Sequence, residues 1–375
     1  MRPLLDHLED LPYRSILYAT SSLDIYYQRP ESSMLYVYTE ADLIELAKFY
    51  TALEYPGTED ADARLIADEG AVVFRTVDDV SHPPSLPFAP LNFFYVPNER
   101  KYIDPYDVYP CIRTRRLTFL DDIHIYDSWR PFAEVAVLLS RYDFVEDEVS
   151  DQLVDYSRRI RSTLGEDTID DQRRLLVELL ECRNPKAGFQ FLRRCGYVDT
   201  HWRAFSAMYD ISHSKEHHPE GNVWEHTIET FLYRKENDLA ISLGLLFHDS
   251  GKPFAQRVEG RMFDKHAQIG AGIASRFLRR LRFDEDLIDR VVFLVKEHML
   301  PSFIDKLPTF RTERVMSSIL FPQLLELYRC DLASTYRGPD GYYRACKAYR
   351  SYLKNVRNPF RTSDGKKLLR RYVER

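Results

Sequence analysis

Histidine and aspartate residues gather in one part of this sequence. Eight of the eleven histidines lie between His201 and His298. Imidazole and carboxylate ligands without thiolates suit Mn, Fe, Ni, Mg or Zn, and affinity alone does not choose among these metals. The pattern predicts a site for one or two divalent ions, with these residues in chain order: His226, His248 with Asp249, His266, His298 and Asp331.

The centre of this pattern is the stretch LAISLGLLFHDSGKP. A helix is predicted to begin near Asp238 and to deliver His248 and Asp249 at its end, where Gly251 and Pro253 stop it. Adjacent helical residues point about 100° apart, so these two side chains meet at one point only near a helix end or beside a two-metal centre. This arrangement favours Asp249 as a bridging ligand.

The other histidines are predicted to lie on neighbouring helices. His226 lies in NVWEHTIETFLYR, and His266 opens HAQIGAGIASRFLRRLRF, whose small residues permit close helix packing. In DEDLIDRVVFLVKEH, Asp284 is the predicted N-cap, and His298 falls one turn after Leu294 on the inward face. An inward histidine is neutral and hydrogen-bonded, or it binds a metal.

Asp331 lies four residues after Leu327 in an apolar helix, where an unpaired carboxylate would be costly. Taken singly, each residue has a simpler explanation, as a hydrogen-bonded core histidine or a local hydrogen-bonding aspartate. The order of all six residues over about one hundred positions indicates a metal site far more specifically than any one of them does.

Around this site the chain divides into regions of different periodicity. Residues 14–135 are predicted to alternate strands and short helices, with strands in SILYAT, SMLYVYT, AVVFRTV, LNFFYV and KYIDPYD, a helix in ADLIELAKFYTALE, and a proline-rich connection over Ser81–Pro90. After about Phe132 the strands stop, and apolar stripes with a period near 3.6 predict helices to residue 200. A second helical block is predicted from Asn222 to about Leu353.

Composition restricts the class of protein. The 375 residues carry a net charge of −6 and 44% hydrophobic residues, which indicates a folded multi-domain chain and argues against a general nucleic-acid binder. The five cysteines show no CxxC spacing and are predicted to be reduced thiols. We see neither a signal peptide nor a membrane segment, and we predict a cytoplasmic protein. The basic tail from Lys354 to Arg375 is predicted to be a solvated helix or an RNA contact.

The block from Asn222 to Thr335 resembles the HD superfamily of metal-dependent phosphohydrolases. The phrases HHPEGNVWEHT, LLFHDSGKP and KHAQIGA resemble in particular the HD domain that follows the polymerase head in bacterial CCA-adding tRNA nucleotidyltransferases. The resemblance implies a first metal site formed by His226, His248, Asp249 and Asp331. It further implies that His266 and His298 complete a second site and that Lys252 faces substrate phosphate; the simpler interpretation of Lys252 is a surface lysine in a turn.

Such a site would hydrolyse phosphoesters through metal-bound water, with Asp249 and Lys252 as catalytic groups. The first half of the chain resembles the polymerase head of the CCA-adding enzymes. Its glycine pair falls near Thr20–Ser22, its paired carboxylates fall on Ser33 and Leu35, and Pro87 and Phe88 replace the expected Arg-Asp. Because nucleotidyl transfer needs carboxylates for Mg²⁺, we expect a degenerate, noncatalytic head.

The sequence therefore predicts an α+β protein: a mixed α/β nucleotidyltransferase-like head over residues 1–135, an all-α neck over 136–205, an all-α HD domain over 206–355 and a basic tail over 356–375. The predicted function is that of a metal-dependent phosphohydrolase or phosphodiesterase acting on a nucleotide or a phosphorylated RNA end. The first alternative is a regulatory RNA- or nucleotide-binding protein with a structural metal. The second alternative is an active tRNA nucleotidyltransferase.

Overall fold

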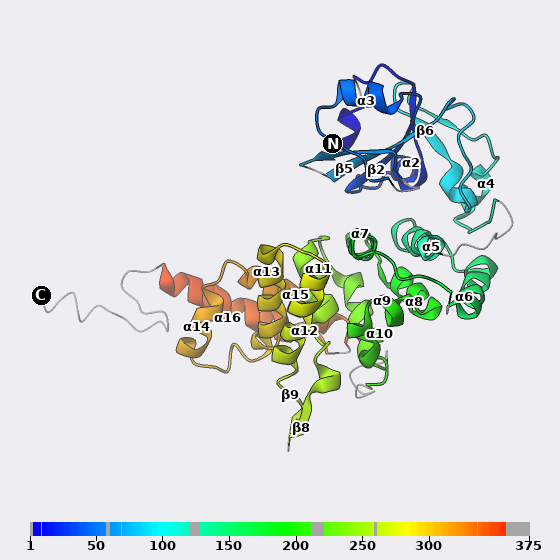
Figure 1. Ribbon diagram of the computed structural model, residues 1–375. Helices are drawn as coiled ribbons and strands as arrows, with labels where there is room; N and C mark the ends of the chain where they lie inside the picture. Colours follow the sequence, from blue (N-terminus) through cyan, green and yellow to red (C-terminus); the bar gives the residue numbers. More distant parts are fainter. Residues whose placement is uncertain are drawn as a thin grey trace, which may run out of the picture. The chain divides into compact units, whose positions relative to one another are not determined.

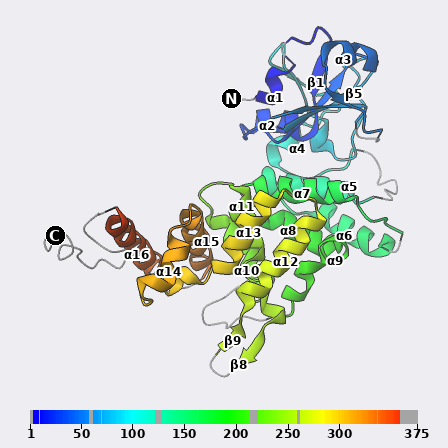
Figure 2. The same cartoon turned by 60° about the vertical axis from the view of Figure 1, so that its left-hand side comes forward.

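The computed structural model divides the chain into two compact units, Met1–Leu164 and Gly165–Arg375 (Figures 1 and 2). The structure describes residues 3–8, 10–57, 61–68, 70–120, 128–161, 163–211, 221–258, 261–335 and 337–357. Most of the basic tail and the segment His217–His218 lie outside these residues.

The first unit is built on a mixed sheet of seven strands (Figure 1). Their order is β3-β4-β5-β2-β1-β6-β7, and only β2 and β5 run parallel among these pairs. The strands are β1 (Ser15–Leu17), β2 (Met34–Thr39), β3 (Leu53–Glu54), β4 (Ala63–Ala67), β5 (Gly70–Thr76), β6 (Phe94–Val96) and β7 (Lys101–Ile103).

The five strands predicted from aromatic and β-branched runs are confirmed as β1, β2, β5, β6 and β7. The short strands β3 and β4 were not predicted, because an edge strand of two residues and one containing two alanines show little alternation. The helices of this unit are α1 (Pro3–Asp6), α2 (Ala19–Tyr26), α3 (Leu43–Phe49), the 3₁₀ helix η1 (Ala89–Asn92), α4 (Tyr109–Thr114), α5 (Arg130–Arg141) and α6 (Glu148–Ile160).

Strand β2 lies inside this sheet and has two different faces, as alternation requires. Leu35 and Val37 join a buried cluster that includes Leu4 of α1 and Leu46 of α3. On the opposite face the ring of Tyr38 stacks on Tyr18 with centroids 4.0 Å apart.

A buried ion pair connects α2 to α5 within the first unit. The guanidinium of Arg141 donates from Nε and Nη2 to the two carboxylate oxygens of Asp24, each at 2.6 Å. The Tyr142 hydroxyl donates to the same carboxylate at 2.9 Å. Asp24 is 1% exposed, so this charge depends on its partners.

The second unit is helical apart from one hairpin. It contains α7 (Ile169–Glu181), α8 (Lys186–Cys195), α9 (Tyr197–His201), η2 (Arg203–Met208), α10 (Val223–Glu229), η3 (Thr230–Tyr233), α11 (Leu239–Phe247), η4 (Lys252–Phe254), α12 (His266–Arg280), α13 (Glu285–Glu297), η5 (Leu300–Ser302), α14 (Thr309–Met316), α15 (Phe321–Ala333) and α16 (Asp340–Val356). The predicted α+β class, with strands in the first part and helices after it, is confirmed. The hairpin of β8 (Gln256–Val258) and β9 (Arg261–Asp264) is a small addition that was not predicted.

Helix α11 occupies the centre of the second unit. Residues Ala240–Phe247 are all buried, and α7, α10, α12, α13 and α15 pack around them (Figure 2). A helix that is apolar on every side needs such enclosure. This position carries the end of α11, with His248 and Asp249, into the interior.

None of the five cysteines forms a disulfide. In the described ranges, no helix combines the length and the apolar character that crossing a membrane requires. The division at residues 164–165 falls inside the predicted neck. The finer domain boundaries stay predictions.

Candidate metal centre

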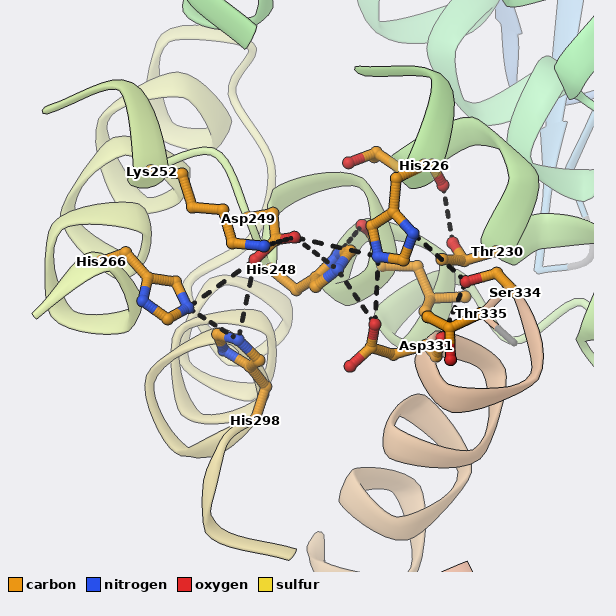
Figure 3. A network of polar contacts seen from close by, with 12 residues as sticks. His226, Thr230, His248, Asp249, Lys252, His266, His298, Asp331, Ser334 and Thr335 are labelled. Atoms are coloured by element: carbon orange, nitrogen blue, oxygen red, sulfur yellow. Dashed lines mark hydrogen bonds and ion pairs between the residues drawn. The ribbon is translucent and has the colours of Figure 1, made fainter. Parts of the chain in front are cut away.

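Five helices of the second unit bring the six predicted metal ligands to one place (Figure 3). His226 lies on α10, His248 and Asp249 follow the last residue of α11, and His266 is the first residue of α12. His298 ends α13 and Asp331 lies on α15.

Helix caps fix where these ligands emerge. The Asp238 carboxylate accepts from the Ile241 amide at 2.8 Å at the start of α11, and the Asp284 carboxylate accepts from the Leu287 amide at 2.8 Å at the start of α13. Each cap satisfies a backbone amide at the start of its helix, and the two helices end at His248 and His298. The predicted start of each helix is confirmed.

One group of ligands comprises His226, His248 and Asp331. His226 Nε2 lies 3.0 Å from Asp331 Oδ1, and His248 Nε2 lies 3.8 Å from the same oxygen. His226 and His248 are 0% and 1% exposed, whereas the Asp331 side chain is 25% exposed. The carboxylate therefore forms the open side of this group.

The second group comprises Asp249, His266 and His298. His266 Nε2 and His298 Nε2 lie 3.7 and 4.0 Å from Asp249 Oδ1, and 3.2 Å from each other. All three side chains are buried.

Asp249 lies between the two groups. Its Oδ2 is 3.3 Å from His248 Nε2 and 3.9 Å from His226 Nε2, while its Oδ1 faces His266 and His298. One oxygen thus points to each group, which is the arrangement a bridging carboxylate needs.

The hydrogen bonds of the ring Nδ1 atoms determine whether the Nε2 atoms are donors or acceptors. Nδ1 of His248, His266 and His298 lies 2.7, 2.9 and 2.7 Å from the carbonyl oxygens of Leu245, Phe263 and Val295, so each Nδ1 carries the proton. The Nε2 atom of a neutral ring is then an acceptor, aimed into the centre.

These lone pairs face one another without a donor between them. His266 Nε2 and His298 Nε2 are 3.2 Å apart, and His248 Nε2 has no hydrogen-bond partner among the described residues. Buried acceptors that converge in this way are satisfied by a cation. The donor set therefore fits one or two divalent ions.

Burial and neighbouring charge favour the ligand form of each group. Burial lowers the pKa of His298 to about 4 and also lowers the pKa of His266, so both rings stay neutral at pH 7. Burial raises the pKa of Asp249, but His248 and Lys252 outweigh it and hold this pKa well below its usual value. The pKa of Asp331 is likewise lowered against burial by its contact with His226 and the nearby His248.

Lys252 lies beside the centre, on η4. Its Nζ is 2.5 Å from Asp249 Oδ2, and its side chain is 13% exposed. The simpler expectation of a surface lysine is wrong, because the side chain is mostly buried and its ammonium is directed to the Asp249 carboxylate. Contact with substrate phosphate stays a prediction.

Two glycines let the chain after Asp249 lie against α12. A Cβ on Gly251 would stand 2.0 Å from the His266 carbonyl oxygen and 2.6 Å from the Gly270 amide nitrogen. Such contacts exclude any larger residue at Gly251. The close approach holds the beginning of α12, and with it His266, next to Asp249.

Ser334 is a further residue of the site that was not predicted from the sequence. Its hydroxyl lies 3.3 Å from His226 Nδ1 and donates to the Asp331 carbonyl at 2.7 Å. Ser334 follows Asp331 by three residues and so lies on the same side of the helix end. That spacing is the signal that would have found it.

In the first unit, the head positions that were predicted to lack carboxylates are occupied by structural groups. Leu35 is 3% exposed in the core, and the Ser33 carbonyl accepts from the Ala71 amide at 2.8 Å. Phe88 is fully buried, and the Ser21 hydroxyl accepts from the Tyr36 amide at 2.7 Å. None of the residues of the described strands β1, β2 and β5 is Asp or Glu.

No family model matches the chain. Among curated proteins, the CC-adding tRNA nucleotidyltransferase of Thermus thermophilus is 31% identical over 172 residues, which is 43% of this chain and 38% of that protein. The multifunctional CCA protein of Psychromonas ingrahamii is 24% identical over 200 residues, which is 52% of this chain and 48% of that protein. The chain thus spans less than half the length of these relatives.

Solved structures show the same fold. The Bacillus stearothermophilus CCA-adding enzyme in complex with CTP aligns with a TM-score of 0.55 at 12% identity, covering 93% of this chain and 81% of that one. A tRNA-processing enzyme in its apo form aligns with a TM-score of 0.53 at 12% identity, covering 100% of this chain and 94% of that one.

These comparisons overturn the predicted activity. The expectation of a phosphohydrolase or phosphodiesterase is wrong, because the relatives are named as nucleotidyltransferases and CCA proteins, which points to the second alternative, a tRNA nucleotidyltransferase. The error came from treating metal ligands as evidence of hydrolysis, although a metal site does not define a reaction. Over the matched stretches the chain is homologous to CCA-adding tRNA nucleotidyltransferases, and it shares the fold of CCA-adding enzymes.

Proposed function

We propose that this protein acts in tRNA 3′-end metabolism by binding tRNA and nucleotides, with a divalent-metal centre in its helical unit. The observation that carries the proposal is the 31% identity to a CC-adding tRNA nucleotidyltransferase. The alignment of 93% of this chain with a CCA-adding enzyme in complex with CTP supports the nucleotide part.

In this proposal His226, His248, Asp249, His266, His298 and Asp331 hold the metal. An ion there supplies positive charge that satisfies the converging Nε2 atoms and carboxylates. The ligands come from five helices, so the bound centre ties α10, α11, α12, α13 and α15 together. Ser334 and the carbonyl oxygens on Nδ1 orient the rings toward the ions.

Binding to a tRNA transcript that ends at its discriminator base tests the proposal. We expect a filter-binding or gel-shift affinity for this tRNA that exceeds the affinity for an unrelated hairpin of equal length, measured at the same salt concentration because phosphate contacts depend on salt. Equal affinity for both RNAs would contradict tRNA recognition.

A second candidate is nucleotidyl transfer itself, which the names of the relatives favour. Transfer needs carboxylates to hold Mg²⁺. The first carboxylates after β2 are Glu40 and Asp42. Glu40 accepts from Arg14 at 3.0 Å and from the Val80 amide at 3.1 Å, and Asp42 accepts from the Glu45 amide at 2.7 Å as the N-cap of α3.

Incubation of the tRNA with CTP, ATP and Mg²⁺ decides between the candidates. Extension by one to three nucleotides that is lost in Glu40→Gln/Asp42→Asn would establish transfer and identify its carboxylates. Tight tRNA binding without extension would support the binding function and contradict nucleotidyl transfer. Asp62→Asn is the matched control, because Asp62 also accepts backbone and hydroxyl hydrogen bonds at the surface of this sheet.

A further inference from the structure

A cavity of about 910 Å³ opens between the end of α15 and the start of α16 in the second unit. Its charged lining residues are all basic: Lys235, Arg329, Arg337, Lys347 and Arg350. The cavity lies within the range of volumes that hold small organic ligands. An anionic ligand is the chemistry that such a lining fits.

Part of this charge is already compensated. Glu326 lies 2.6 Å from Arg329 Nη2 and 3.9 Å from Lys235 Nζ. Arg337, Lys347 and Arg350 have no carboxylate partner among the described residues. Three cations at one cavity therefore keep their full attraction for an outside anion.

Two tyrosines complete the lining and add a second kind of recognition. Tyr343 is 63% exposed, and Tyr342 lies beside it with ring centroids 5.7 Å apart. An exposed aromatic ring next to arginines offers a face on which a nucleobase stacks while its phosphate meets the cations.

The same chemistry continues along α16. Tyr343, Lys347, Arg350, Lys354 and Arg357 are all exposed and follow one another at spacings of four and three residues. This spacing places them on one side of the helix. The basic stripe, defined as these five residues, extends for about 21 Å at 1.5 Å per residue.

We propose that the cavity and the basic stripe bind nucleotide units of single-stranded RNA, one base in the cavity on Tyr343 and the following phosphates along α16. The inference deepens the proposed function and rests on it for the identity of the RNA. A free nucleotide has the same base and phosphate as a nucleotide unit in an RNA strand, so the experiment tests free nucleotides as well as RNA. Single-stranded RNA is favoured over duplex because a base inside the cavity must be unpaired.

The probe is a fluorescein-labelled 12-nucleotide oligoribonucleotide, titrated with the full chain and observed by fluorescence anisotropy. Tyr343→Ala is expected to weaken binding roughly five-fold or more, which is the effect of removing one stacking ring. Lys347→Glu/Arg350→Glu is expected to reduce the slope of log affinity against log salt by about 1.4, since each phosphate contact on a single strand contributes about 0.7. Competition with CMP, ATP and a fully paired duplex identifies the source of the bound unit.

A matched control makes the same change of charge elsewhere. Arg158 and Arg159 are exposed on α6, and Arg158→Glu/Arg159→Glu should leave affinity and salt slope unchanged. Displacement of the oligonucleotide by CMP or ATP supports a nucleotide site at the cavity, and resistance to both nucleotides supports an extended strand. Stronger competition by duplex than by single strand, or unchanged binding in both variants, overturns the inference.

Failure of this inference is distinguishable from failure of the proposed function. If tRNA binds specifically and the α16 variants bind equally well, tRNA recognition stands and the cavity is not the site. If oligonucleotide binding depends on Tyr343, Lys347 and Arg350, but tRNA is not preferred over a hairpin, the cavity is supported as an RNA site and tRNA recognition is contradicted.

Discussion

Replacement of His298 by alanine tests the two-ion arrangement directly. The change removes one of the two lone pairs that meet at 3.2 Å and leaves the second group with Asp249 and His266. Two ligands hold a divalent ion far more weakly than three or four. We therefore expect about half the wild-type metal content, with the ion at His226, His248 and Asp331 retained.

The effect on stability has two parts that can be separated. Loss of a buried ring costs on the order of 1–3 kcal/mol through packing alone. An ion present at 100 times its dissociation constant stabilises the folded state by about 2.7 kcal/mol, and the variant loses this second amount only when metal is present. The difference in melting temperature between variant and wild type should therefore be larger with added metal than with chelator.

His201→Ala is the control for packing. His201 is 4% exposed, lies against Tyr197 with centroids 4.4 Å apart, and is not one of the clustered ligands. It should lower the melting temperature by a similar amount with and without metal and keep full metal content by mass spectrometry. Full metal content in the His298→Ala protein, with only a lower melting temperature, would refute the two-ion arrangement.

Three further changes test the architecture. Arg141→Met should destabilise the first unit by about 3–5 kcal/mol in chemical denaturation, because it leaves the buried Asp24 charge without its bidentate partner. Gly251→Ala should lower both melting temperature and metal content, because the added Cβ meets the His266 carbonyl oxygen. Burial, with Arg280 and Arg203 nearby, lowers the pKa of His201 to about 4. Between pH 6.5 and pH 4 the unfolded chain therefore binds a proton at this ring that the folded chain does not bind, so the stability of the wild type should fall as pH decreases across this window. In His201→Phe this fall in stability should be smaller by about 2–3 kcal/mol in total.

Each of these changes has a control within the chain. Arg29→Met removes a surface partner of Asp143 and should cost less than about 1 kcal/mol. Gly165→Ala places a Cβ where nothing lies within 4 Å and should be nearly silent. An Arg141→Met protein as stable as Arg29→Met, a Gly251→Ala protein with normal metal content, or equal pH slopes in wild type and His201→Phe would each contradict the corresponding argument.

The candidate site could be predicted because its signals are local. His298 was placed one turn beyond Leu294, and both residues are buried on the same side of α13. The end of α11 after Phe247 followed from the apolar run and the glycine and proline after it. Helical phase and stop signals depend only on neighbouring residues, so a single sequence contains them.

The basic cavity could not be predicted because distant residues form it. Lys235 precedes α11, whereas Arg350 lies on α16, and only the packed helices bring them together. The sequence showed a basic segment from Lys354 onward and did not show that the stripe begins at Tyr343. The edge strand β3 and its neighbour β4 were missed for a similar reason, since the pairing of Leu53 with Leu65 depends on the completed sheet.

We expect the burial of the six proposed metal ligands to determine how fast a bound metal exchanges. Five of the six ligands are at most 8% exposed, and the sixth, Asp331, is 25% exposed in its side chain. An ion between Asp249, His266 and His298 can leave only when the surrounding helices separate, so its dissociation rate is limited by local opening of the fold. An ion beside Asp331 has a shorter route to solvent. Chelation should therefore proceed in two phases, and the slow phase should accelerate with denaturant while the fast phase does not.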